Sequence, residues 1–148
     1  MPVKLIAPLI KTFTLEATDK KYSNDGDPTT VTVRQARKKQ DIERQAYFDT
    51  MRREWDSAEP DKVALVTNIG LQALMQLEVW LTLCECNLLN VDGSVLFPSK
   101  QEDNEPVLAM KRSEFDKAWG ALPGDIADEI HAKVLEVNPV WRGLSGEG

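Results

Sequence analysis

The spacing of apolar residues changes along the chain and divides it into elements. Near the start, Phe13 and Leu15 alternate with polar neighbours, which is the period-two pattern of a half-buried strand. Val31 and Val33 repeat this alternation in the segment TTVTVRQ. The stretch between them, DKKYSNDGDPTT, is polar and rich in turn residues, so we expect a long-looped β-hairpin within residues 1–34.

The pattern then becomes helical. From residue 35 to 58, apolar side chains recur three to five residues apart among charges of both signs, which predicts a surface helix with one buried face. The next segment, KVALVTNIGLQALMQLEVWLTLCECNLLN, is apolar around nearly its whole helical circumference and predicts a long helix that is buried on most sides. Polar residues such as Asn68, Glu78 and Glu85 interrupt this segment, so we do not expect it to span a membrane.

The last third of the chain predicts a turn, a strand and two further helices. Asp92-Gly93 is a turn signal, residues 95–97 are a candidate strand, and QEDNEP is interpreted as a loop. A short helix is expected from Ser113, whose side chain can cap it. Pro123-Gly124 and Asn138-Pro139 bound a final helix, with Asp125 as a cap and an apolar stripe of Ile126, Ala127, Ile130, Val134 and Val137.

We therefore predict a mainly α protein, a small helical domain with a long buried central helix and a minor N-terminal β-hairpin. Residues 1–148 are expected to form a single domain, with a hairpin arm (1–34), a helical core (35–141) and a flexible, glycine-rich tail (142–148).

Two flanking helices would hardly cover a central helix of this length, so self-association is expected. The candidate residues for a partner or oligomer interface come from the central helix and from the C-terminal stripe. The alternative for each is a place in the protein's own core. They are Leu77, Trp80, Leu83, Ile130, Val134, Val137 and Trp141.

Charge and composition narrow the function classes. The formal net charge is -6 over 148 residues, which disfavours a nucleic-acid-binding protein because phosphates need a basic face. The basic run RQARKK is followed at once by acidic residues, so we interpret it as the solvated start of a helix.

The sequence contains no pattern typical of an active site or a metal centre. His131 is the single histidine, and we place it at the edge of the stripe, in a solvated pair with Asp128. Cys84 and Cys86 are interpreted as reduced core residues on a helix, where their side chains would point in different directions. We therefore predict no catalytic residue, no metal ligand and no cofactor; a hydrolase centred on Asp128 and His131 is the less favoured alternative.

Three phrases together carry a resemblance to a known family. VTVRQARKKQDIERQAYF, LEVWLTLCECNLL and EFDKAWGALPGDIADEIHAKVLEVNPVW follow one another over roughly residues 28–141. In this order they resemble the small tail assembly chaperones of long-tailed, siphovirus-like bacteriophages.

The resemblance implies a mostly helical protein without enzymatic activity that works in the host cell cytoplasm. It implies binding to the tape measure protein, whose hydrophobic helices it keeps soluble, recruitment of tail tube subunits, and absence from the mature virion. It also implies a longer product of the same gene, formed by a frameshift near the end. A structural tail-completion or connector protein of the particle is the alternative.

Overall fold

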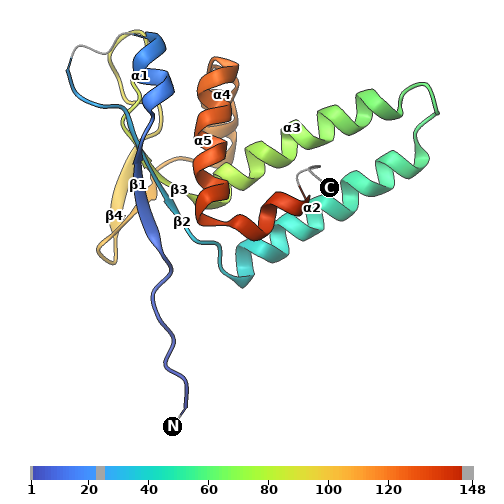
Figure 1. The fold of residues 1–148 in the computed structure, drawn as a ribbon, viewed down its shortest axis with the longest axis horizontal. Helices are drawn as coiled ribbons and strands as arrows, with labels where there is room; N and C mark the ends of the chain where they lie inside the picture. The colour runs from blue at the N-terminus through green and yellow to red at the C-terminus, as the bar shows by residue number, and fades with distance from the viewer. Residues whose placement is uncertain (1, 23–25, 145–148) are drawn as a thin grey trace.

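The structure, a computed structural model, describes residues 2–22 and 26–144. A small antiparallel sheet lies at one side of the molecule, and helices α4 and α5 stand beside it (Figure 1). A pair of long antiparallel helices, α2 and α3, extends away from this body. The predominance of helix and the N-terminal hairpin are confirmed, but the strand content is larger than we predicted.

The sheet has the order β1-β2-β3. Strand β1 (Ile10–Thr14) pairs with β2 (Thr30–Arg34) in the predicted hairpin, with Phe13 opposite Val31. Strand β2 is the centre of the sheet, and its residues Val31 and Val33 are fully buried. The connection between the two strands contains a short helix, α1 (Glu16–Tyr22), which the polar composition of this stretch did not predict.

The two long helices are α2 (Lys38–Ser57), close to its predicted range, and α3 (Val63–Thr82). The prediction that the central helix continues to residue 90 is wrong, because the chain leaves α3 and forms β3 (Leu83–Cys86). Strand β3 pairs with β2 and supplies hydrogen-bond partners to an edge that would otherwise be open. Tertiary pairing has therefore overridden the helical pattern of the sequence.

A glycine lets the two long helices approach each other. A Cβ atom on Gly70 would lie 2.5 Å from Sδ of Met51, which is buried. The hydroxyl of Tyr47 also donates to the Gly70 carbonyl oxygen, at 3.4 Å. The missing side chain at this position thus sets the spacing between α2 and α3.

The predicted loop QEDNEP instead forms the turn and the adjoining strand ends of a second β-hairpin. Strands β4 (Ser99–Glu102) and β5 (Glu105–Leu108) pair across Asp103 and Asn104, whose φ angles are 52° and 65°. Two successive left-handed residues are typical of a type I′ turn, and Asp and Asn tolerate that backbone best after glycine. Residues 95–97 do not form the predicted strand.

The C-terminal helices match the prediction closely. Helix α4 spans Arg112–Gly120 and α5 spans Gly124–Val137. Ser113 is not the N-cap of α4; the backbone N–H of Lys111 donates instead to Glu114 Oε1, at 2.8 Å. Asp125 lies in the first turn of α5, where it accepts from the N–H of Ile126 at 3.0 Å.

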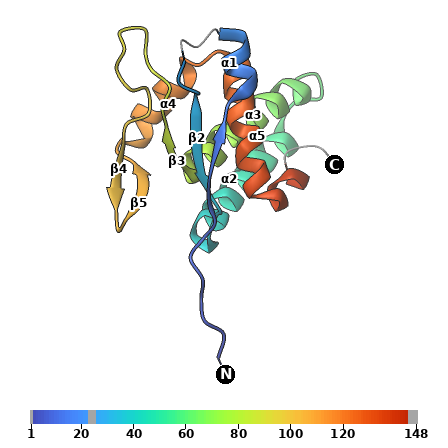
Figure 2. The same ribbon diagram turned by 60° about the vertical axis from the view of Figure 1, so that its left-hand side comes forward.

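A 3-10 helix, η1 (Pro139–Leu144), follows α5. It includes the first residues of the predicted flexible tail, and residues 145–148 lie outside the described residues. The core lies between the sheet, α3, α4 and α5, as the turned view in Figure 2 also indicates. Phe97, Phe115 and Ile130 are among its largest buried side chains.

Candidate functional site

A buried ionic cluster links the two long helices to the C-terminal part of the chain. Glu78 on α3 is fully buried and accepts two short hydrogen bonds. Nε of Arg44, on α2, donates to Glu78 Oε2 at 2.6 Å, and Nε2 of His131, on α5, donates to Oε1 at 2.6 Å. We call Arg44, Glu78 and His131 the buried cluster.

Trp141 on η1 contacts Arg44 of the buried cluster. Nη2 of Arg44 donates to the Trp141 carbonyl oxygen at 3.1 Å, and the guanidinium lies 5.1 Å from the centre of the indole ring. The indole N–H donates to Asp41 Oδ1 at 3.0 Å. The cluster therefore fixes the C-terminal turn against the first turns of α2.

The prediction for His131 is wrong. The side chain is 7% exposed and bonds to Glu78, whereas the predicted partner Asp128 is exposed. On a helical wheel His131 lies at the edge of the apolar stripe. No pattern in the sequence indicates that a carboxylate on α3 faces this edge. Glu78 and Arg44 gave a weak signal of a buried ion pair. Both lie on helices with apolar faces, and a buried charge without a partner is too costly to persist.

The burial of the cluster limits its chemistry. The side chains of Arg44, Glu78 and His131 are exposed by 3%, 0% and 7%, so a substrate has no access to them in this conformation. We interpret the cluster as a structural junction between α2, α3, α5 and η1. Within the described residues, no group of three or more His, Cys, Asp or Glu side chains is arranged to hold a metal ion.

The two cysteines are free and buried. They lie in strand β3 and not on a helix, so the predicted reason for keeping them apart is wrong. Burial raises the pKa of the Cys84 thiol, and burial raises the pKa of Cys86 to about 11. Both groups are therefore protonated, weakly nucleophilic thiols at neutral pH.

The structure places the predicted interface residues inside the protein's own core. Six of them are at most 6% exposed, and Trp80 is half-buried with its ring 5.3 Å from that of Phe115. A partner could reach the six only by displacing packed side chains, so they do not form an accessible surface in this fold. The six are Leu77, Leu83, Ile130, Val134, Val137 and Trp141.

Exposed apolar side chains occur instead on the first half of α3. None of the residues from Val63 to Ile69 is buried, whereas every residue from Leu77 to Val79 is. Leu65 and Ile69 are both 60% exposed and lie one helical turn apart, and Val63 is 38% exposed. We call Val63, Leu65 and Ile69 the α3 patch; it lies on the half of the α2–α3 pair that extends beyond the body (Figure 1).

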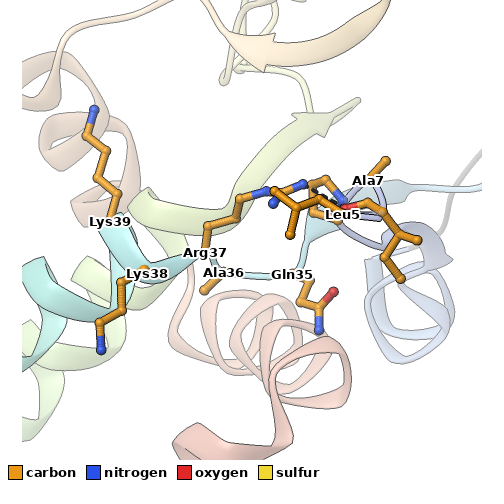
Figure 3. A pocket seen from close by; sticks show the side chains of 9 residues that line it. Leu5, Ala7, Gln35, Ala36, Arg37, Lys38 and Lys39 are labelled. Atoms are coloured by element: carbon orange, nitrogen blue, oxygen red, sulfur yellow. Dashed lines mark hydrogen bonds between the residues drawn. The ribbon is translucent and has the colours of Figure 1, made fainter. Parts of the chain in front are cut away.

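A second exposed apolar segment precedes β1. Residues 2–9, which we call the N-terminal arm, are extended and leave the sheet toward one end of the molecule (Figure 1). Val3, Leu5 and Ile6 are 92%, 85% and 84% exposed. Figure 3 shows Leu5 and Ala7 beside Gln35, Ala36 and Arg37 at the corner between β2 and α2, where a groove of about 630 Å³ lies.

Helix α3 is long and apolar enough to cross a membrane by length and composition, with a mean hydropathy of 1.2. In this fold, however, its second half carries buried Glu78 and packs against α5. A helix in a protein core can be as long and apolar as a membrane span. We therefore interpret α3 from its contacts, as a helix that packs against α5 and α2.

Comparisons with protein-family models, with curated proteins and with solved structures find no match to this chain.

Proposed function

We propose that this protein is a tail assembly chaperone of a long-tailed bacteriophage, which binds the tape measure protein and keeps its hydrophobic helices soluble until the tail tube forms. One observation supports the proposal best: the first half of α3 presents the α3 patch on a helical hairpin that stands clear of the body. The family itself is inferred from the resemblance of the sequence.

The α3 patch has the character of a helix-binding surface. Two leucine-sized side chains one turn apart can pack against the apolar stripe of an amphipathic client helix. Burying such a side chain stabilises a complex by about 1.5–3 kcal/mol, so a few contacts suffice for reversible binding. Reversibility is what a chaperone needs, because the client must be released into the growing tail.

The charge of the chain fits the same role. The net charge of -6 keeps the complex of chaperone and apolar client in solution through mutual repulsion between copies. Client binding is thus assigned to Val63, Leu65 and Ile69, in place of the seven core residues that the sequence suggested. Recruitment of tail tube subunits and the frameshift-extended product remain parts of the proposal that rest on the resemblance alone.

Co-expression with the tape measure protein of the same phage tests the client assignment. We expect the wild-type chain to increase the soluble fraction of the tape measure protein severalfold. The double variant Leu65→Asp and Ile69→Asp should lose this effect, because burying a carboxylate against an apolar client helix is costly.

The control is Val91→Asp, which places one carboxylate at a fully exposed apolar position outside the α2–α3 pair. It should behave as the wild type does. Equal loss in both variants, or undiminished solubilisation by the double variant, would refute the assignment of the client to the α3 patch.

A structural tail-completion or connector protein is the second candidate, because a projecting apolar hairpin also suits a permanent contact with a neighbouring subunit. Mass spectrometry of purified particles distinguishes the two. A chaperone is absent from the particle, whereas a structural subunit is present at a fixed copy number.

A further inference from the structure

The N-terminal arm carries apolar side chains that its own chain does not cover. Val3, Leu5 and Ile6 are at least 84% exposed, and Leu9 is 53% exposed. Several exposed apolar side chains in one short extended segment are typical of an interaction surface. Among the described residues, exposed apolar side chains also lie on the α3 patch and in the loop that holds Leu89, Val91 and Val95; of these two, the α3 patch is the one on a helix face.

The root of the arm is fixed to the body by hydrogen bonds. The N–H of Gln35 donates to the Leu9 carbonyl oxygen at 2.7 Å, and Nη2 of Arg37 donates to the Ile6 carbonyl oxygen at 3.1 Å. These contacts hold the backbone, while the side chains of Val3, Leu5 and Ile6 remain at least 84% exposed. The arm is therefore presented as an ordered extended segment at the start of α2.

The arm is too short to cover the α3 patch of its own chain. Helix α2 has 20 residues and is about 30 Å long, and the patch lies near its far end because α3 returns antiparallel to it. Val3 and Leu5 lie three residues and one residue before Ile6, so at roughly 3.3 Å per residue they can reach only about 10 Å from the bond between Arg37 and Ile6. An arm that covers the patch has to come from another molecule.

We propose that the arm of one copy docks on the α3 patch of a second copy, so that two chains exchange arms. The charges are complementary: Lys4 lies between Val3 and Leu5 on the arm, and the turn before the patch carries three exposed carboxylates against one exposed lysine, namely Asp56, Glu59, Asp61 and Lys62. Exchange is reciprocal in a two-fold dimer, so each arm-to-patch contact occurs twice. This contact does not depend on a client.

A mixing experiment tests the exchange directly. Leu5→Cys and Ile69→Cys are prepared as separate proteins, reduced, mixed and then oxidised. We expect a disulfide-linked dimer that contains one chain of each kind, formed at least several times faster than dimers in either protein alone. The native Cys84 and Cys86 are 1% and 3% exposed and should not interfere.

The matched control replaces Ile69→Cys by Val91→Cys, which is fully exposed but lies outside the hairpin. Cross-linking of Leu5→Cys to this control at the same rate would overturn the proposal. So would a disulfide within a single chain that carries both Leu5→Cys and Ile69→Cys, because the arm would then reach its own patch.

Sedimentation analysis provides an independent measurement. The wild type should form a concentration-dependent dimer, and the variant Val3→Asp with Leu5→Asp should weaken it by roughly tenfold or more, as desolvating a carboxylate is costly. Circular dichroism should not change, because these side chains are exposed. A wild type that is monomeric throughout, or a dimer that the arm variant does not weaken, would overturn the proposal.

The result of the arm-exchange experiments can be distinguished from the result of the client experiment. The arm variant keeps Leu65 and Ile69, so it should still solubilise the tape measure protein. Loss of the dimer with retained client binding supports arm exchange, while failure of client binding in the wild type refutes only the proposed function.

Discussion

Glu78 is the residue on which the junction between the long helices and the C-terminal turn depends. Its carboxylate is fully buried and accepts from Arg44 and His131 together, so the Arg44 guanidinium has a counter-group and the His131 ring has a hydrogen-bond partner. Such a site contributes to the free energy of folding mainly through the penalty that appears when one member is lost.

Replacing Glu78 by alanine should therefore lower the free energy of unfolding by about 3–5 kcal/mol, because Arg44 would lose its buried partner. Urea unfolding followed by tryptophan fluorescence measures the change. Glu85→Ala is the control, since Glu85 is exposed on β3 and its loss should cost no more than about 0.5 kcal/mol. A loss below about 1 kcal/mol for Glu78→Ala would contradict the role of the cluster.

For single residues, the sequence predicted which side chains are buried better than it predicted which side chains they bond to. The stripe on α5 was found because Ile130, Val134 and Val137 repeat at helical spacing, and all three are buried. The pairing of Glu78 with His131 joins residues 53 positions apart, and no local pattern encodes that separation. For the same reason, apolar residues were assigned to an interface that the fold uses as its core.

At the scale of elements, a single missing side chain sets the contact between α2 and α3. Gly70→Val should destabilise the pair by about 1–3 kcal/mol, because the added methyl groups overlap Met51, whose side chain is buried and cannot move away freely. Chemical denaturation gives the value. In a background of Met51→Ala the same substitution should cost less, and an unchanged cost would show that the two residues are not coupled.

Helix α1 is held on α5 by charges at its two ends. Glu129 accepts from the N–H groups of Ala17 and Thr18, at 3.0 and 2.9 Å. At the other end, Nζ of Lys21 donates to Asp125 at 2.6 Å. This element lay in a stretch that we interpreted as a loop, because its stabilising partners are more than one hundred residues away in the sequence.

The Asp125 contact predicts a pH dependence. The hydrogen bond from Lys21, followed by that from Tyr22, holds the pKa of Asp125 below its ordinary value, and the same contact raises the pKa of Lys21. The carboxylate therefore favours attachment of α1 above its unfolded pKa of about 3.9, and this contribution is lost as the pH falls through the lower folded pKa. The lysine contribution is complete below about pH 10 and is lost as the pH rises through the raised pKa.

Nuclear magnetic resonance of Tyr22 can follow the attachment between pH 7 and pH 2. The ring signals should shift toward those of an unattached helix on acidification, and Asp125→Asn should remove most of this change. Asp128→Asn, at an exposed position of the same helix, is the control and should leave it intact. The attribution to Asp125 fails if Asp125→Asn titrates as the wild type does.

At the scale of the whole molecule, stability is distributed unevenly along α3. Its second half contains Glu78, which bonds to His131 on α5, while residues Val63–Ile69 at its start include no buried residue and expose the α3 patch. The sequence suggested a uniformly buried helix because its apolar residues encircle it, yet the body of the protein is large enough to cover only one half. Apolar composition alone could not tell which half is covered.

Hydrogen exchange should reveal this division. At concentrations low enough for single copies, the amides of Val63–Ile69 should exchange roughly tenfold faster or more than those of Leu77–Thr82, because opening the projecting half breaks few buried contacts. Both segments belong to one helix of similar composition, so each serves as the control for the other. At high concentration the arm of a second copy should slow exchange in Val63–Ile69, and the arm variant should abolish this protection. Equal exchange in the two halves at low concentration would mean that the hairpin is as firmly held as the core, and the α3 patch would then be a poor candidate for reversible binding.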